Sequence, residues 1–389
     1  MSLGHGAKIV TDGLKFAYDM GSKQSWKGKP TTNLVNQPTT AFSNWSGFTG
    51  TSTLRTTRQG RNRVHLIGTA SGGVQWYNTG GQKVVTPSTE YTVSATIKYD
   101  GTTPHPNLFY IRQYNSSGSQ TSENGKFSTS YMTPLGDGWY RAYRTFTTDS
   151  TAVRALVQGY QYTAPCNIQI QDVQLELGNI NSPYVDGTRS NTEAIIDWAG
   201  NNTVTANSLI YASDNTFKFD GTVQDNYCTI TPSSTLSALK GSNNITVETW
   251  VKYSSYSGGA QSYSVITCWG SPWVWLLENP SNKLRFRITA GGSDVNIVDP
   301  DVHPLNTWLH VVGTYDGSSK KIYVNGVLKN SSAQTGALGS PGGTPKIGTY
   351  QGTNYNMSGN IDSVKIYNKA LTASEIKQNF NALRGRFGI

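Results

Sequence analysis

The sequence has little cysteine, few helix-forming residues and no long apolar run, and each shortage excludes a class of protein. Its three cysteines are odd in number and widely spaced, so they indicate neither a disulfide framework nor a cysteine-based metal site. Ala, Leu, Glu and Lys are too scarce for a helical bundle or a coiled coil. No apolar run approaches the roughly 20 residues of a membrane-spanning helix. Residues 1–8 lack the apolar core of a secretory signal, so we expect export, if any, by another route.

Polar and aromatic residues are abundant instead. Ser, Thr, Asn and Gly make up about two-fifths of the 389 residues. Aromatic residues make up 11%, which argues against disorder because disordered chains contain few of them. This mixture favours antiparallel β-sheet joined by many turns. At about 150 residues per domain, the length predicts two or three domains.

Alternation of apolar and polar residues predicts several half-buried strands. In 91–99, Tyr, Val, Ala, Ile and Tyr share one face, and Thr, Ser, Thr and Lys share the other. The same alternation runs through 139–147, 167–177 and 283–289, and Asn325-Gly326 predicts a tight hairpin turn. The expected fold class is therefore all-β, with two antiparallel β-sandwich or jelly-roll domains.

One short C-terminal helix is expected beside these strands. Thr372 and Glu375 have the spacing of a capping box, and Leu371 and Ile376 are placed as a hydrophobic staple. The pattern predicts a helix over 373–383, followed by a short tail.

The C-terminal half resembles the laminin-G-like, concanavalin-A-like jelly rolls of bacterial and phage surface proteins. Five segments carry the resemblance by their order and spacing: 217–222 (Phe-Lys-Phe-Asp-Gly-Thr), 245–251 (Ile-Thr-Val-Glu-Thr-Trp-Val), 306–317, 322–327 and 359–368. That family usually opens with a strand of the form Gly-Leu-x-x-x-x-Asp. Residues 13–19 fit this strand but lie about 200 residues too early, whereas 195–202 resemble the loop that normally follows it.

The displaced strand implies that one domain interrupts another. We expect residues 1–32 to contribute the first strand of the laminin-G-like domain, 33–188 to form an inserted domain, 189–383 to complete the sandwich and 384–389 to form a tail. The insert resembles the jelly-roll carbohydrate-binding modules, through Asn33-Leu-Val, Phe42-Ser-Asn-Trp-Ser and two further segments: 138–144 and 172–178.

The motif Gln174-Leu-Glu-Leu-Gly-x-x-x-Ser-Pro-Tyr184 and the ending around 373–388 are similar to those of phage virion proteins. The resemblance implies a virion structural protein on the particle surface: a capsid decoration, a head fibre or a neck or tail-fibre component. Its implied partners are other virion proteins and host-surface glycans, and it leaves a homo-oligomer open. The sequence has no zinc-finger spacing or long basic run that would indicate sequence-specific nucleic-acid binding.

Sugar binding requires aromatic platforms and a few polar groups that fix the orientation of the ring. The candidates are Trp45, Trp76, Tyr77, Tyr160, Tyr162, Tyr350 and Tyr355. Trp273 and Trp275 alternate along one strand after Trp269 and are interpreted as core residues rather than as a binding surface.

Two sets of charged residues are candidates for binding ions or anionic partners. Structural calcium would use Asp19, Asp197, Asp220 and Asp362, which lie near strand ends, although such residues also cap turns or pair with Lys and Arg. The excess of positive charge lies mostly in the first 189 residues and is densest at Arg55, Arg58, Arg61 and Arg63. This patch would face an anionic partner or simply form a solvated surface. No other cofactor is indicated.

The sequence does not predict an enzyme. Glycosidases need two carboxyl groups about 5–9.5 Å apart, and Asp172 and Glu176 are about 13 Å apart along one strand at ~3.3 Å per residue. Pro300 between Asp299 and Asp301 favours a turn. His310 lies in a strand pattern and is interpreted as packed rather than catalytic. The predicted function is thus a non-catalytic virion structural protein. A glycan-binding adhesin is the alternative, and a glycan-degrading enzyme comes third.

Overall fold

The chain folds into two compact units, one of which is built from two separate stretches of sequence. The computed structural model describes residues 8–22, 24–35, 45–46, 51–58, 61–68, 74–78, 82–100, 110–124, 131–161, 166–211, 217–223, 225–255, 264–270, 273–278, 283–350 and 355–389, with the backbone alone at 45–46, 51–58, 61–68, 74–78, 100, 159–161, 166–167, 217 and 273–278. The split unit combines Met1–Lys29 with Asn191–Ile389, and the inserted unit is Pro30–Ser190.

The split unit contains an eight-stranded antiparallel sheet. In spatial order its strands are β17 (Ile210–Tyr211), β18 (Phe217–Phe219), β29 (Gly359–Tyr367), β20 (Ile245–Tyr253), β25 (Leu309–Tyr315), β26 (Ser319–Val324) and β27 (Val327–Ala333), with β1 (Leu14–Asp19) also paired to β29. The β26–β27 turn is the predicted hairpin, because Asn325 and Gly326 have φ angles of 51° and 76°.

A seven-stranded sheet forms the second layer of the split unit. Its strands are β16 (Thr203–Asn207), β19 (Tyr227–Thr231), β28 (Lys346–Ile347), β21 (Ser264–Trp269), β22 (Trp273–Glu278), β23 (Leu284–Ala290) and β24 (Ser293–Val298). Buried apolar side chains of both sheets, such as Val247 and Val364 from one and Phe286 and Ile288 from the other, belong to one hydrophobic core. The unit is therefore a β-sandwich.

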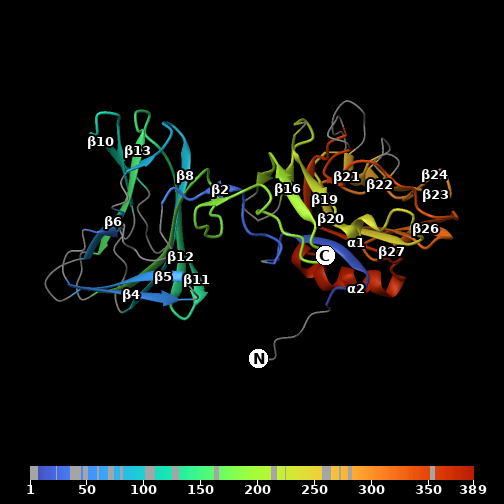
Figure 1. Ribbon diagram of the computed structural model, residues 1–389, viewed down its shortest axis with the longest axis horizontal. Coiled ribbons are helices and arrows are strands. Elements are labelled where there is room, and N and C mark those ends of the chain that lie inside the picture. Colours follow the sequence, from blue (N-terminus) through green and yellow to red (C-terminus); the bar gives the residue numbers. More distant parts are fainter. Residues whose placement is uncertain are drawn as a thin grey trace. The chain divides into compact units, whose positions relative to one another are not determined.

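Strand β1 ties the first residues of the chain to this sandwich. It pairs antiparallel with β29 over Leu14 to Asp19. Strand β18 pairs with the same edge of β29, farther along that strand. Phe16 and Tyr18 are fully buried in the core of the split unit. In Figure 1 this blue strand lies among strands coloured yellow to red. The local Gly-Leu-x-x-x-x-Asp pattern thus forms a core strand although its partner is more than 300 residues away in sequence.

The inserted unit is a second two-layered β-structure. One sheet has the order β10 (Gln120–Asn124), β9 (Tyr110–Tyr114), β13 (Arg154–Gln161), β6 (Val74–Asn78) and β3 (Trp45–Ser46), with β7 (Lys83–Val84) also paired to β13. The other has the order β11 (Met132–Gly136), β12 (Trp139–Thr147), β8 (Glu90–Asp100), β14 (Cys166–Leu177), β5 (Arg61–Gly68) and β4 (Thr51–Arg58). Val93 and Ile97 of β8 share a core with Ile111 of β9 and Val157 of β13.

Polar side chains fasten the two ends of the inserted unit to each other. The short strands β2 (Thr31–Thr32) and β15 (Thr188–Arg189) pair antiparallel. The Asn33 amide donates to the Val173 and Val185 carbonyl oxygens at 3.1 and 3.3 Å and accepts from the Leu175 N–H at 3.1 Å. These contacts hold Asn33, at the predicted start of the insert, against the insert's last long strand, β14.

The motif at 174–184 has a structural role of the same kind. The Gln174 side chain accepts from the Val185 N–H at 2.9 Å, and the Glu176 carboxylate accepts from the Ser182 N–H at 2.9 Å. Both side chains are fully buried. The alternating polar residues of this motif therefore bind the backbone of the returning segment.

The structure confirms the predicted helix, α2 (Ala373–Leu383), and its capping box. Two further helical elements are α1 (Ser234–Ser237) and a 3₁₀ turn over Arg384–Phe387. The tail packs on its own unit. Arg386 forms an ion pair with Asp19 at 2.6 Å and another with Asp362, and the Phe387 ring stacks on Trp250 at 4.1 Å. The sequence analysis expected a tail here but did not predict these contacts. The all-β fold class is confirmed.

Candidate functional site

One face of the β10–β9–β13 sheet collects aromatic and polar side chains. Along β9, Ile111 lies in the core and Gln113 is buried, which leaves Tyr110, Arg112 and Tyr114 on the opposite face. Along β13, Ala155 and Val157 belong to the core, which leaves Leu156 and Gln158 beside the β9 residues. We call Tyr110, Arg112, Tyr114, Glu123 and Gln158 the β9 face.

Strand register arranges these residues in rows across the sheet. Tyr110 lies opposite Gln158, and Arg112 lies between Leu156 on one side and Glu123 on the other. Tyr114 lies between Arg154 and Gln120. Because paired residues of neighbouring strands point to the same side, each row presents its side chains together.

Contacts within the β9 face hold its charged groups in place. Arg112 Nε donates to Glu123 Oε1 at 2.9 Å, and its guanidinium carbon lies 5.6 Å from the centre of the Tyr110 ring. Gln158 Nε2 donates to the Tyr110 hydroxyl. Burial lowers the pKa of Arg112, but the hydrogen bond to Glu123 and the neighbouring Tyr110 outweigh this and raise the pKa. The guanidinium therefore stays charged.

The β9 face is partly open to solvent. The side chains of Arg112 and Glu123 are 34% and 30% exposed, whereas Tyr110 and Gln158 are buried. Tyrosine rings stack on the apolar faces of sugars, and charged and amide groups bond to sugar hydroxyls. The half-buried Tyr114 ring and the Arg112–Glu123 pair therefore offer the two kinds of contact that carbohydrate recognition uses, whereas the Tyr110 ring supports them from below.

Four of the five aromatic candidates of the insert lie on strands of this same sheet. Trp45 is in β3, Trp76 and Tyr77 are in β6, and Tyr160 is in β13. The backbone of Tyr77 pairs with that of Gln158, so it continues the row that begins at Tyr110. The side chains of these four residues, and all of Tyr162, lie outside the described residues.

Sequence reasoning missed Tyr110, Arg112, Tyr114 and Gln158. A usable signal was present, because Tyr-Ile-Arg-Gln-Tyr places two tyrosines and an arginine at every second position of a short strand. The pattern was overlooked because its buried face holds Gln113, which accepts a hydrogen bond from the Asp149 N–H at 2.7 Å. Because one of the two residues on the core face is polar, the strand does not show the usual alternation of apolar and polar residues.

The arginine patch lies on the β4–β5 hairpin. Arg55 and Arg58 are in β4, Arg61 and Arg63 are in β5, and the backbones of Arg58 and Arg61 are paired. The side chains of all four arginines lie outside the described residues. The anionic-partner patch therefore stays a prediction.

Tyr350 and Tyr355 form a small aromatic cluster on the split unit. Their rings meet edge to face, with centres 5.6 Å apart, and pack against Val265 and Cys268 in a cluster separate from the main core. Both tyrosines are half-buried, so they remain a second candidate platform. Trp269, by contrast, is fully buried in the core of the split unit, and the side chains of Trp273 and Trp275 are not described.

The four aspartates proposed for calcium have other partners. Asp197 accepts four backbone N–H groups, and Asp220 caps its own turn through the Thr222 N–H at 2.9 Å. Asp19 and Asp362 both pair with Arg386. Within the described part of the chain, no three His, Cys, Asp or Glu residues group as metal ligands would. These contacts are the capping and pairing that the sequence offered as the alternative.

The carboxylates considered for catalysis are bound to structural partners. Glu176 holds the returning segment at Ser182, and Asp172 accepts hydrogen bonds from Thr96 and Gln171. Asp299 is buried and contacts His303 Nε2 at 2.6 Å. His310 is buried against the Trp250 and Phe380 rings, as its strand pattern predicted.

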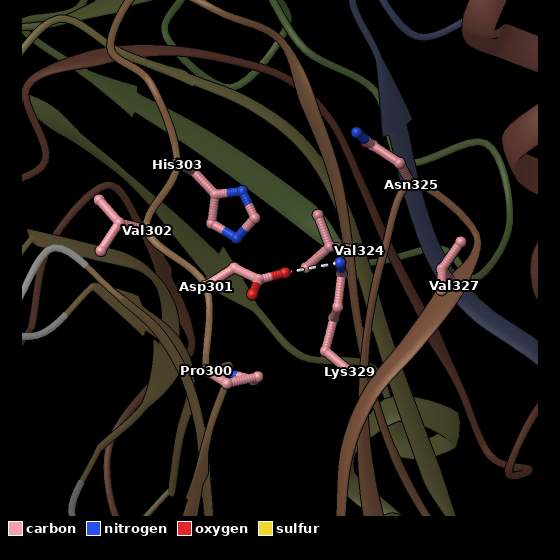
Figure 2. Close-up of a pocket in the computed structure, with 8 residues that line it drawn as sticks. All are labelled: Pro300, Asp301, Val302, His303, Val324, Asn325, Val327 and Lys329. Atoms are coloured by element: carbon pink, nitrogen blue, oxygen red, sulfur yellow. Dashed lines mark hydrogen bonds and ion pairs between the residues drawn. The ribbon is translucent and has the colours of Figure 1, made fainter.

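A shallow pocket of about 610 Å³ lies beside β27. Figure 2 shows Asp301 and Lys329 pointing toward each other across it, and their ion pair measures 2.7 Å. The hydrogen bond from Lys329 lowers the pKa of Asp301. The two charges neutralise each other, and the other residues that line the pocket are Pro300, Val302, His303, Val324, Asn325 and Val327.

Comparison with known proteins finds one family match, which lies within the split unit. Residues 220–377 match the family model described as the concanavalin A-like lectin/glucanases superfamily. This match confirms the laminin-G-like, concanavalin-A-like resemblance for that segment. No curated protein matches the chain. No helix among the described residues is long and apolar enough to cross a membrane.

Several solved structures are similar to part of the chain. The binding domain of botulinum neurotoxin serotype G is 20% identical, with a TM-score of 0.40 and 48% of each chain covered. The binding domain of Paraclostridial Mosquitocidal Protein 1 is 15% identical, with a TM-score of 0.40 and coverage of 48% of this chain and 49% of that one. The chain thus spans about half the length of the solved structures it matches.

Proposed function

We propose that this protein is a non-catalytic display protein that binds host-surface glycans through the β9 face of its inserted unit. The observation that supports the proposal most is the Arg112–Glu123 ion pair, which lies on the same strand face as the half-buried ring of Tyr114. The apolar faces of sugars stack on such rings, and their hydroxyls bond to such charges. The aromatic candidates of β3 and β6 extend the same sheet.

Structural use of the carboxylates favours binding over catalysis. A glycosidase needs one carboxyl group to donate a proton and a second to act as base or nucleophile. Asp172, Glu176 and Asp299 are instead engaged by hydrogen bonds that build turns and hold segments. We therefore assign none of them a catalytic role.

We further propose that the protein is part of a phage particle, as a capsid decoration, a head fibre or a neck or tail-fibre component. The support is the sequence resemblance of 174–184 and of the segment from α2 to the tail. In the structure both segments make contacts within their own unit.

A glycan array compares the wild type with Arg112→Ala and Tyr114→Ala. Both variants should lose at least tenfold in affinity, because each removes a polar or stacking group from the β9 face. Tyr143→Ala is the matched control, since Tyr143 is an exposed tyrosine of β12 in the other sheet of the same unit. Equal binding by all four proteins would refute the β9 site. If only a Tyr350→Ala variant lost glycan affinity, the binding site would instead lie on the split unit.

Antibody labelling of purified phage particles tests the location. Labelling of the capsid, neck or tail is expected. Particles without label, from cells that produce the protein, would contradict the virion assignment and leave a glycan-binding adhesin.

A further inference from the structure

Three buried polar side chains meet beneath helix α2. Glu248 of β20 and Lys365 of β29 lie opposite each other in the sheet, and Asn379 enters from α2. Lys365 Nζ lies 3.0 Å from Glu248 Oε1, and Asn379 Nδ2 donates to Glu248 Oε2 at 2.6 Å. The amine and the amide therefore contact the two oxygens of a single carboxylate, and at most 1% of each of these three residues is exposed.

The Asn379 amide is also polarised from its other side. Its Oδ1 accepts a hydrogen bond from the Val10 N–H at 2.7 Å, and its Nδ2 also donates to the Tyr367 hydroxyl at 3.1 Å. A backbone N–H that bonds to a carbonyl oxygen stabilises the negative charge that develops there when a nucleophile adds to the carbon.

The surroundings of the cluster are aromatic and exclude water. Trp250 and Phe380 stack with ring centres 5.8 Å apart, and Phe387 covers Trp250. Burial raises the pKa of Glu248, but Lys365 and then His310 and Asn379 outweigh this and lower the pKa to about 2. The carboxylate is therefore ionised and paired with the Lys365 ammonium.

We propose that Lys365 and Asn379 become joined by an intramolecular isopeptide bond, with Glu248 transferring the protons. Glu248 holds the Lys365 amine at one carboxylate oxygen and the Asn379 amide at the other, so an intramolecular reaction replaces a bimolecular encounter. Lysine amines act as nucleophiles once a neighbouring base takes their proton in a desolvated site.

The reaction needs no further reagent. Glu248 Oε1 takes a proton from the Lys365 ammonium, and the free amine adds to Asn379 Cγ while the Val10 N–H stabilises the oxyanion. Glu248 then returns a proton to the Asn379 nitrogen, which leaves as ammonia when the C–N bond breaks. The Lys365 nitrogen loses its remaining extra proton to ammonia, so the products are a neutral amide and ammonium, and Glu248 is regenerated.

The bond would fasten α2 covalently to β29. It would fix the C-terminal helix over the sheet, and it is independent of whether the β9 face binds glycans. Without the bond, the same cluster is a buried ion pair with an added amide, which is the result that would overturn the proposal.

Mass spectrometry of the denatured full-length protein distinguishes the isopeptide bond from the unreacted cluster. The wild type should lack one ammonia relative to its sequence mass. Asn325-Gly326 also loses ammonia when it cyclises, so the residue that has lost ammonia must be identified by analysing tryptic peptides. Trypsin should yield a branched peptide that joins 347–369 to 378–384, with no cleavage after Lys365. Wild type at full sequence mass, with normal cleavage after Lys365, would overturn the proposal.

Two variants identify the roles of the residues. Lys365→Arg keeps a cation beside Glu248 but supplies no amine, so it should fold and keep the full sequence mass. Glu248→Gln keeps the shape of the side chain but removes the base, so the branched peptide should be lost. A branched peptide that forms to the same extent in Glu248→Gln would refute the role of Glu248. Circular dichroism of both variants shows whether they fold.

Discussion

At the scale of single residues, buried polar side chains do much of the work of holding distant segments together. Asn33, Gln174 and Glu176 hold the two ends of the inserted unit by hydrogen bonds to backbone groups. Asp197 has the same role in the split unit, where it connects the loop after the insert to β1. Buried carboxylates and amides that accept several N–H groups replace the water those groups would lose on folding.

Removing the Asp197 carboxylate should destabilise the split unit. It accepts from the N–H groups of Ala17, Ala199 and Gly200 at 2.8, 3.0 and 3.1 Å, and from Asn202 N at 3.1 Å. Asp197→Ala leaves these donors without their acceptor, which should cost about 3 kcal/mol of unfolding free energy. Urea denaturation measures the loss. The exposed Asp225→Ala serves as control, and equal stability of the two variants would contradict this role.

At the scale of elements, β1 and α2 show how a short local pattern acquires its partner. The capping box defined where α2 begins, because the Thr372 hydroxyl accepts from the Glu375 N–H at 3.3 Å and Glu375 bonds back to the Thr372 N–H at 2.8 Å. The pattern did not show that α2 covers a buried charge cluster. That depends on strands up to about 130 residues away in sequence.

The cap of α2 gives a prediction at this scale. Thr372→Ala removes the acceptor at the helix N-terminus and should cost about 1 kcal/mol, a fall in melting temperature of roughly 2–4 °C. Differential scanning calorimetry measures it. Ser374→Ala is the matched control, because Ser374 is exposed in the first turn of the same helix. An equal fall in both variants would show that the cap itself contributes nothing.

At the scale of the whole molecule, the interrupted sandwich decides which parts of the chain can be separated. The split unit takes its first strand from before the insert and everything else from after it. The flanks of the insert meet in the β2–β15 pair, where Thr32 lies opposite Thr188. That the insert is a separable folding unit, over 33–188, remains our prediction.

Deletion of 33–188 tests this organisation. Joining Thr32 to Arg189 should leave a cooperatively folding protein, because the joined ends are neighbours in the structure and the core of the split unit is intact. Thermal unfolding followed by circular dichroism measures it. Residues 191–389 alone should be less stable, since they lack Phe16, Tyr18 and the pairing of β1 with β29. An unfolded deletion protein would contradict the prediction.

The sequence by itself determined the all-β class, the strand alternation of β8 and β12, the Asn325-Gly326 turn and the boundaries of α2. These follow from local rules, because periodicity, turn residues and caps act over a few positions. The candidate site was predicted only in part: the aromatics of β3 and β6 drew attention to its sheet, but Tyr110, Arg112 and Gln158 were not recognised.

Only the tertiary structure decided which distant residues meet. Strand register placed Arg112 between Glu123 and Leu156, and it placed Glu248 opposite Lys365 with Asn379 above them. Antiparallel pairing between strands far apart in sequence depends on how the whole core packs, and no local pattern encodes it. The composition therefore predicted sheets, whereas the packing of those sheets produced the β9 face and the cluster under α2.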